Sequence, residues 1–349
     1  MSNEIVNVAV IGTGMGRYHM QDYSTLPDAK LVAICDLNEA EARFFAEKYG
    51  APHVFSDYRR LFELPGLDAV SIAVPNYLHA PITLAALEAG LHVLCEKPMA
   101  TTVEDATAMV EKARAVGKRL MVHMNMRFRD ANLALGRLSA AGELGQVYYG
   151  RASMIRRRLV PVLHFPPNGT MGRGPWFLDK EKAGGGALMD IGVHTYDLMW
   201  WLMGCPRPVA VSAATFRKLY GDAAAKRGIK FDVDELASAM IRFENGATAF
   251  VDVSWAANQA AEWNVRVFGD KAGLMVSPAT LFRDRDGVLE SATIELPEME
   301  RFTPQAHFVD CIRHPEKALI CPGEQGLQVV RVLDAVRRSA EQGREVAVA

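Results

Sequence analysis

Two side chains with acid–base chemistry lie close together in the segment 184–197. Asp190 and His194 follow a run of three glycines, a pattern that predicts a turn entering a helix. Residues at this spacing share one helix face, so the carboxylate can orient the imidazole and raise its basicity. The apolar run 196–203 predicts that the helix is buried, which favours a functional pair over a solvated one. Asp190 and His194 are therefore candidates for catalysis and substrate binding.

A lysine in the segment Glu96-Lys97-Pro98 is the second chemical candidate. The segment ends a predicted strand, His92–Cys95, at the carboxyl edge where open α/β sheets bind ligands. Pro98 restricts the backbone of Lys97, which favours a lysine that points into this crevice over an ordinary surface lysine. Hydride transfer from an alcohol needs a proton acceptor and a donor for the developing alkoxide. His194 and Lys97 can supply them.

Three glycines lie where the first predicted strand, Val6–Ile11, should turn into the first helix. Gly12, Gly14 and Gly16, with Met15 between the last two, would let backbone amides and a helix N-terminus approach a pyrophosphate. The spacing is GxGxG and not GxGxxG, with Arg17 where the usual third glycine would stand. Taken alone, the motif also fits a plain tight connection.

An acid follows the second predicted strand, Leu31–Cys35. Asp36 lies about 20 residues after the glycines, the separation expected for the acid that binds the adenosine ribose hydroxyls. An acid there repels a 2′-phosphate and favours NAD over NADP, although Arg43 could meet a phosphate and leaves NADP open. The alternative role for Asp36 is to cap the next helix. Because glycines and acid end consecutive strands, the cofactor role is favoured.

These residues require a sheet that presents strand ends along one edge. The first third of the chain alternates apolar strands with helices, which predicts a doubly wound parallel sheet of the Rossmann type. The strands are expected at 6–11, 31–35, 69–74, 92–95 and 119–124, and the helices at 39–49, 82–89 and 103–116.

The pattern changes after residue 124 to longer alternating runs joined by turns. Residues 236–243 and 248–254 flank Asn245-Gly246 and predict a hairpin, which strands at 263–268, 274–276 and 281–285 continue. A helix is expected over 324–341. We therefore predict an α/β protein with two domains: a dinucleotide-binding domain over 1–124, and over 125–349 an α+β domain with a large, mostly antiparallel open sheet.

Composition limits the class of protein. The chain has 349 residues, 50% hydrophobic and 23% charged, with a net charge of -2, which predicts a globular protein without affinity for polyanions such as nucleic acids. Its five cysteines include no CxxC pair, so neither a disulfide framework nor a metal site is predicted. With no signal peptide and no unbroken apolar span, a cytoplasmic protein without membrane contact is expected.

Four motifs in this order resemble the glucose-fructose oxidoreductase and inositol dehydrogenase family (Gfo/Idh/MocA). The resemblance covers nearly the whole chain, and its last two motifs are specific together. The motifs are Gly12-x-Gly14-x-Gly16, Val74-Pro75-Asn76-Tyr77-Leu78-His79, Ala89 to Pro98 with Glu96-Lys97-Pro98, and Gly184-Gly185-Gly186 followed by Asp190, Gly192, His194 and Asp197.

The resemblance implies roles for these residues. Lys97 would hydrogen-bond the reacting oxygen, His194 would be the acid/base, and Asp190 would be its partner or a ligand of a substrate hydroxyl. In similar proteins the Lys97-Pro98 peptide is often cis. The resemblance also implies a homodimer or homotetramer built on the open sheet. The positions that it assigns to the cofactor site are Pro75, Asn76, His79 and Glu96, next to Lys97.

Further substrate contacts are expected outside the motifs. Binding a sugar requires hydrogen bonds and an apolar or aromatic platform. From their position in the sequence, Trp176 and the loop from Arg156 to Pro175 are expected to provide them. Of the three consecutive arginines 156–158, at least one should face solvent, so a single one, Arg156, is the candidate. Arg127, after the last Rossmann strand, is another, with an interdomain ion pair as its alternative role.

The resulting prediction is an NAD-dependent dehydrogenase that oxidises a hydroxyl of a sugar, anhydrosugar or inositol-like polyol. Two alternatives stay open. A glycoside hydrolase that recycles its NAD would keep both Lys97 and His194. A non-catalytic sugar-sensing regulator would commonly lack one of them, and both are present.

Overall fold

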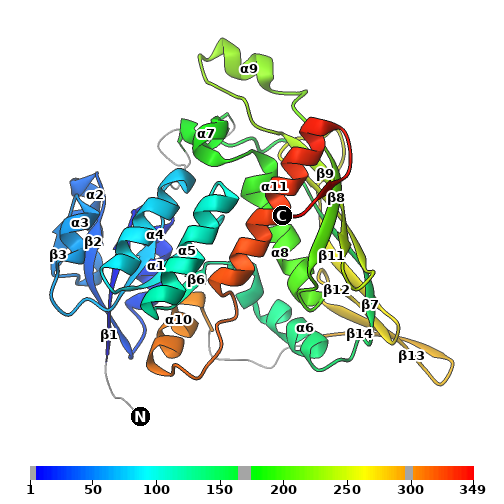
Figure 1. Cartoon of the computed structure of the whole chain (residues 1–349), viewed down its shortest axis with the longest axis horizontal. Helices are drawn as coiled ribbons and strands as arrows, with labels where there is room; N and C mark the ends of the chain where they lie inside the picture. The colour runs from blue at the N-terminus through cyan, green and yellow to red at the C-terminus, as the bar shows by residue number, and fades with distance from the viewer. Residues whose placement is uncertain (1–4, 164–173, 295–301) are drawn as a thin grey trace. The chain divides into compact units, whose positions relative to one another are not determined.

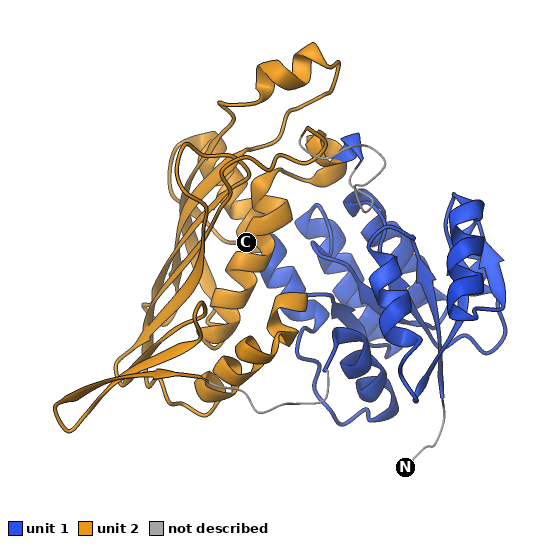
Figure 2. Ribbon diagram, turned by 180° about the vertical axis from the view of Figure 1, so that it is seen from behind, with its two compact units in different colours: residues 1–124, 167–176, 302–330 blue, residues 125–166, 177–301, 331–349 orange. Residues whose placement is uncertain are grey.

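A computed structural model describes residues 5–163, 174–294 and 302–349, which form two compact units (Figure 2). The first unit comprises residues 1–124, 167–176 and 302–330, and the second comprises residues 125–166, 177–301 and 331–349.

The first unit is built on a six-stranded sheet in the order β3-β2-β1-β4-β5-β6, in which every pair is parallel. The order reverses between β1 and β4, where a doubly wound sheet binds its ligands. The predicted Rossmann sheet is thus confirmed. Its strands are β1 (Val6–Ile11), β2 (Ala29–Cys35), β3 (His53–Phe55), β4 (Ala69–Ile72), β5 (His92–Cys95) and β6 (Leu120–Val122).

Helices connect these strands (Figure 1). Three of them begin at side-chain caps, because Asn38 accepts from the amide of Glu41, Asp57 from that of Arg59 and Thr102 from that of Asp105. The helices are α1 (Gly16–Tyr23), α2 (Glu39–Tyr49), α3 (Tyr58–Phe62), α4 (His79–Glu88) and α5 (Val103–Val116), with a 3-10 turn η1 (Asn76–Leu78) before α4.

A late segment of the chain also packs in the first unit. Helix α10 (Pro304–Arg313) contacts α1, β1 and β5 through buried residues such as Phe308 and Val309. The structure therefore differs from the predicted contiguous domains, 1–124 and 125–349, because residues 302–330 supply apolar side chains to the first core. Helix α11 (Gly323–Gln342) begins in the first unit and ends in the second.

The second unit holds a nine-stranded sheet in the order β14-β13-β12-β11-β7-β10-β9-β8-β15. All neighbours are antiparallel except β7 and β10, so the expected open, mostly antiparallel sheet is confirmed. Its strands are β7 (Val147–Ile155), β8 (Pro208–Phe216), β9 (Leu236–Phe243), β10 (Thr248–Ser254), β11 (Glu262–Gly269), β12 (Ala272–Met275), β13 (Thr280–Arg285), β14 (Val288–Thr293) and β15 (Val346–Ala347).

The two faces of this sheet differ. Helix α8 (Val193–Leu202) packs on β7, β10 and β11, and it lies so close that a Cβ on Gly150 would be 2.6 Å from Sδ of Met203. Alternate residues point away from α8, and there Tyr149 stacks on Phe268 with ring centroids 5.1 Å apart. Smaller helices complete the unit: α6 (Asp130–Ala140), α7 (Lys180–Ala183) and α9 (Gly221–Lys226), with the 3-10 turn η2 (Asn125–Phe128). The 3-10 turn η4 (Pro175–Leu178) begins in the first unit and ends in the second.

Within the described ranges, the chain has no helix that is both long and apolar enough to cross a bilayer.

Candidate active site

The glycine turn follows β1 and packs tightly against the end of β4. Gly12 has a φ of +95°, and a Cβ on it would lie 2.3 Å from the carbonyl oxygen of Ala73. A Cβ on Gly16 would lie 2.8 Å from Cγ1 of Val10, so this residue allows the close helix–strand packing that the third glycine provides in the usual motif. The shortened spacing therefore keeps the geometry of the motif.

The N-terminus of α1 fits a dinucleotide pyrophosphate. Its N-cap residue, Met15, makes no side-chain capping bond, so the positive end of the helix faces the turn uncapped. Arg17 folds back on the turn, where its Nε donates to the carbonyl oxygen of Gly14 over 2.8 Å. The side chain that replaces the expected glycine thus supports the loop.

Asp36 lies at the carboxyl end of β2 and is joined to the same turn. Its Oδ2 accepts from the amide and hydroxyl of Thr13 at 2.7 and 2.8 Å, and its Oδ1 accepts from the amide of Asn38 at 2.8 Å. Asn38, and not Asp36, is the N-cap residue of α2. Oδ2 already accepts two hydrogen bonds, whereas Oδ1 accepts one and has a second lone pair, so Asp36 can accept a further hydroxyl at Oδ1.

The loops that follow β4 and β5 are tied together by His79. Its Nδ1 lies 2.7 Å from the carbonyl oxygen of Pro98 and its Nε2 lies 2.9 Å from that of Val74. Burial lowers the pKa of His79. Pro75 precedes the 3-10 turn that carries the buried Asn76. His79 holds in register the two loops to which Asn76 and Lys97 belong.

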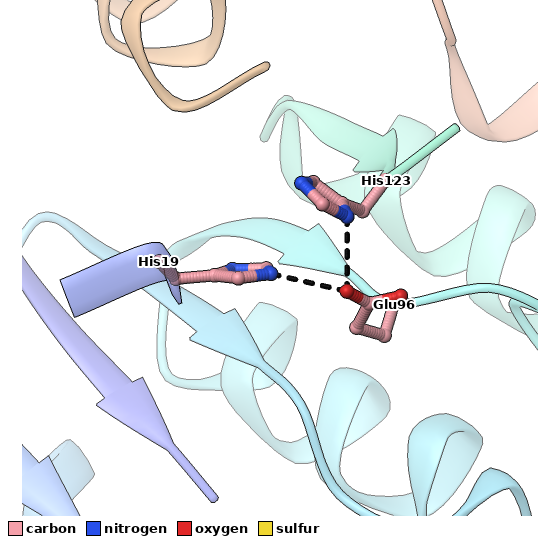
Figure 3. Close-up of side chains that lie close together, drawn as sticks. All are labelled: His19, Glu96 and His123. Atoms are coloured by element: carbon pink, nitrogen blue, oxygen red, sulfur yellow. Dashed lines mark hydrogen bonds and ion pairs between the residues drawn. The ribbon is translucent and has the colours of Figure 1, made fainter. Parts of the chain in front are cut away.

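Glu96 and Lys97 follow β5 directly, and the Lys97-Pro98 peptide is cis. Glu96 is buried, and its Oε1 lies 3.1 Å from Nε2 of His19 and 2.9 Å from Nδ1 of His123 (Figure 3). Its Oε2 accepts from the amide of Lys97 over 3.1 Å. Burial alone would raise the pKa of Glu96, but the two histidines outweigh it and hold this pKa well below its usual range. The carboxylate is therefore ionised.

In the second unit, the glycine-rich turn wraps around Asp234. The carboxylate of Asp234 accepts from the amides of Gly186 and Leu188 at 2.7 and 2.8 Å. A Cβ on Gly186 would lie 1.9 Å from the carbonyl oxygen of Asp234, so only glycine fits there. The helix that follows starts as a π-helical turn, η5 (Leu188–Gly192), and becomes α8 at Val193. Such π-turns occur frequently at functional sites.

Asp190 lies in the π-turn and is held by groups from the sheet. The buried Trp255 donates from Nε1 to Oδ2 of Asp190 over 2.9 Å, and Nη1 of Arg156 lies 4.0 Å from the same oxygen. Of the three consecutive arginines, Arg156 faces Asp190, whereas Arg158 donates to the backbone of Arg157 and Ala257. His194 is half-buried in the first turn of α8.

Arg127 is fully buried in η2 and binds Asp197 of α8 through two hydrogen bonds of 2.9 and 2.6 Å. Its guanidinium also lies over the ring of Trp201. This geometry fits a structural ion pair inside the second unit more closely than a substrate contact. Trp176 is half-buried in η4, and residues 164–173 of the loop before it lie outside the described residues.

Two family models match this chain. Residues 6–124 match the model described as "Oxidoreductase family, NAD-binding Rossmann fold" (GFO_IDH_MocA), and residues 132–275 match the GFO/IDH/MocA C-terminal domain. The chain belongs to the GFO/IDH/MocA oxidoreductase family. The predicted family and the predicted oxidoreductase class are confirmed.

The names of several similar proteins refer to sugars or sugar derivatives. D-glucoside 3-dehydrogenase of Escherichia coli K12 is 33% identical over 360 residues, covering 99% of this chain and 98% of the relative. Levoglucosan dehydrogenase with NADH and L-sorbose superposes with a TM-score of 0.85 at 25% identity, covering 99% of both chains. Aldose-aldose oxidoreductase from Caulobacter crescentus with glycerol gives a TM-score of 0.81 at 27% identity, covering 99% of this chain and 100% of the other.

The sequence-based prediction includes neither His19 and His123, which contact Glu96 in the first unit, nor Trp255, which contacts Asp190 in the second unit. His19 carries a weak signal, because it shares the buried face of α1 with Gly16 and Met20, where a polar residue needs a partner. His123 and Trp255 lie just after strands and belong to no motif.

Proposed function

We propose that this protein is an NAD-dependent dehydrogenase that oxidises a hydroxyl of a sugar, anhydrosugar or polyol. The observation that carries the proposal is the shared carboxyl edge of one sheet. The glycine turn follows β1, Asp36 follows β2 and the half-buried Lys97 follows β5 on that edge. A dinucleotide site and a cationic donor in this order suit hydride transfer at a hydroxyl carbon.

Each polar residue then has a defined task. Lys97 donates a hydrogen bond to the reacting oxygen and stabilises its developing charge, and His194 accepts the hydroxyl proton. Asp190, fixed by Trp255, orients His194 or binds a neighbouring hydroxyl. The bound NAD supplies the hydride acceptor.

The carboxylate of Asp36 supports NAD over NADP, since it would repel a 2′-phosphate. Arg43, which could have favoured NADP, is exposed and pairs with Glu39 at 3.2 Å on the surface of α2. We therefore assign the adenosine ribose hydroxyls to Asp36. The pyrophosphate is assigned to the turn of Gly12, Gly14, Met15 and Gly16, and the nicotinamide side to Pro75, Asn76, His79 and Glu96.

The names of the relatives support a carbohydrate substrate. Arg156, which approaches Asp190, is proposed to bind substrate oxygens, and Trp176 to provide an apolar platform. Arg127 is a weaker candidate because Asp197 occupies its guanidinium. We also propose a cytoplasmic homodimer or homotetramer, and the absence of disulfides among the five cysteines agrees with a reducing compartment.

The experiment follows absorbance of the reduced cofactor while the protein is offered NAD or NADP with sugars, glucosides, anhydrosugars and inositols. Reduction of NAD with one of these classes is the expected result. Asp36→Asn should lower kcat/KM for NAD by about tenfold or more and that for NADP by less, because one ribose contact and the charge that repels phosphate are lost. Asp57→Asn, which changes a carboxylate that follows β3 and caps α3, is the matched control.

Lys97→Met should lower the chemical rate by about 100-fold or more while NAD still binds, since a catalytic group of this kind contributes about 10²–10⁴. Lys118→Met, before β6, is its control. Equal losses of rate and NAD affinity would contradict the assigned role of Lys97. Tight NAD binding without turnover would favour the regulator, and release of an aglycone without net NAD reduction would favour the hydrolase.

A further inference from the structure

Two histidines meet at Glu96 from elements that are distant in the sequence. His19 lies on α1, three residues after Gly16, and His123 follows β6. Their ring centroids are 4.3 Å apart, and all three side chains are buried (Figure 3). The proposed chemistry assigns no task to either histidine.

Hydrogen-bond accounting shows how the three groups fit together. Glu96 is an acceptor only, so His19 donates from Nε2 and His123 donates from Nδ1. His123 then has a free lone pair on Nε2, which accepts from the side-chain amide of Gln305 at 3.2 Å. Burial lowers the pKa of His19, which favours its neutral form with a bare Nδ1. A hydrogen on Nε2 of His19 and one on Nδ1 of His123 thus satisfy the contacts with Glu96.

The same three side chains could present one ligand atom each to a metal ion. A metal would need bare Nε2 on His19 and would move the proton to Nδ1, which is buried and has no acceptor among the described residues. Metal-bound histidines almost always donate their other N–H to an acceptor. The hydrogen-bonded arrangement avoids a buried Nδ1–H without an acceptor on His19, whereas a metal site would create one.

His19, His123 and the Glu96 carboxylate that they hold form a histidine clamp. The carboxylate connects this clamp to the next residue, Lys97. Oε1 is held by both histidines, which fixes the rotation of the carboxylate, and Oε2 accepts from the amide of Lys97. We infer that His19 and His123 are positioning residues for Lys97, acting through Glu96. The inference rests on the proposed role of Lys97 in catalysis.

The clamp also connects the lysine to the cofactor turn. His19 lies on the helix whose first residue is Gly16, so α1 carries both the glycine turn and one of the two donors to Glu96. The register between the dinucleotide and Lys97 is thus set within the first unit. A misplacement of about 1 Å at a reacting group can cost about 100-fold in rate.

The test exploits the two different ring nitrogens. A glutamine amide can replace Nε2 of a histidine and an asparagine amide can replace Nδ1, so His19→Gln and His123→Asn keep the donors. His19→Asn and His123→Gln misplace them, and His19→Leu and His123→Leu remove them. His92→Asn is the control, because His92 lies on β5 and its Nδ1 accepts from the amide of Arg119, a contact that asparagine preserves.

We expect matched variants and the control to keep kcat within about threefold, and mismatched and leucine variants to lose about tenfold to 100-fold. KM for NAD should change by less than about threefold in the histidine variants, because only Lys97 is displaced. Glu96→Gln, which keeps one acceptor oxygen for three N–H groups, should match the leucine variants in its loss of kcat. If the leucine variants do not fold, the comparison of matched with mismatched variants still tests whether His19 and His123 position Lys97.

Equal kcat in matched and mismatched variants would overturn the inference, whether both are fully active or both are impaired. A stoichiometric metal in the purified protein, lost in His19→Gln, would overturn it in favour of a metal site. Lys97→Met, assayed in parallel, separates the two proposals. If Lys97→Met keeps its chemical rate, the proposed catalytic role of Lys97 is wrong. If Lys97→Met loses rate but matched and mismatched histidine variants do not differ, only the positioning role of His19 and His123 is wrong.

Discussion

At the scale of single residues, the buried pair Arg127 and Asp197 is a strong test of what holds the second unit together. Both side chains are about 1% exposed and share two short hydrogen bonds. Burial raises the pKa of Asp197, which Arg127 opposes. Removing one partner leaves the other charged in a nonpolar environment, so Arg127→Met should lower the free energy of unfolding by about 3–5 kcal/mol.

Urea unfolding of Arg127→Met, Asp197→Leu and the double variant measures this effect. The double variant should lose less than the sum of the two single losses, because no unpaired charge remains. Additive losses would mean that the two side chains stabilise the unit independently. Arg207→Met, from the exposed pair with Glu244, should cost less than about 1 kcal/mol.

Sequence patterns single out Lys97, Asp190 and His194 as candidates because each belongs to a motif with fixed spacing. They could not locate the contacts of Glu96. His19 and His123 are far apart in the sequence, and only the parallel order of β1, β4, β5 and β6 brings their elements to one edge. The pairing of Arg127 with Asp197 could not be predicted either, since it joins a 3-10 turn to a helix that is distant in the sequence.

At the scale of elements, the glycine-rich turn determines where the Asp190 helix begins. Its backbone is packed against Asp234, and a Cβ on Gly186 would meet the Asp234 carbonyl. Gly186→Ala should therefore shift the turn, with a loss of about 1–3 kcal/mol in stability and a larger relative loss of activity. Gly221→Ala is the control, because nothing lies within 4 Å of a Cβ there.

Thermal unfolding and steady-state rates of the two variants check this prediction. Wild-type activity in Gly186→Ala would mean that the turn does not position Asp190.

Elements with a clear period were predictable and others were not. The hairpin of β9 and β10 has the predicted bounds, as do α2 and α5. β7 was not predicted because Tyr148 and Tyr149 are both partly exposed and Gly150 replaces a side chain on the covered face. Helix α10 was not assigned to the first unit because its contacts with β1 and β5 carry no local signal.

At the scale of the whole molecule, stability should depend on pH through buried histidines. Burial lowers the pKa of His92 and of His307 to about 4. Between about pH 6.5 and pH 4 the unfolded chain binds more protons than the folded protein, so the free energy of unfolding falls as the pH falls. Protonation of each histidine in the unfolded chain should lower the free energy of unfolding by about 1–2 kcal/mol between pH 6.5 and pH 4, a value reduced because both side chains are partly exposed.

The measurement is the pH dependence of unfolding for wild type and His92→Asn. The variant should lose less stability between pH 7 and pH 5, since it keeps the acceptor for Arg119 but does not titrate. Asp197 and Asp234, whose pKa values burial raises, act in the opposite direction and are common to both proteins. Parallel curves would contradict the assignment.

The proposed assembly also concerns the whole molecule, and the face of the nine-stranded sheet that points away from α8 predicts where self-association would occur. Phe250, Phe268 and Phe282 are 37%, 38% and 40% exposed, and Tyr149 contacts the first two. Aromatic rings gathered on one face favour association, since burying each would contribute about 1.5–3 kcal/mol. Self-association through this face would give the proposed homodimer or homotetramer.

The double variant Phe250→Glu, Phe268→Glu should therefore dissociate into folded monomers, because association would bury paired charges of the same sign. Light scattering after size-exclusion chromatography gives the mass of each species, and circular dichroism reports the fold. Phe44→Glu is the control, since Phe44 is 60% exposed on α2 of the first unit. An unchanged oligomer in the double variant would locate the interface elsewhere, and a monomeric wild type would remove the proposed assembly altogether.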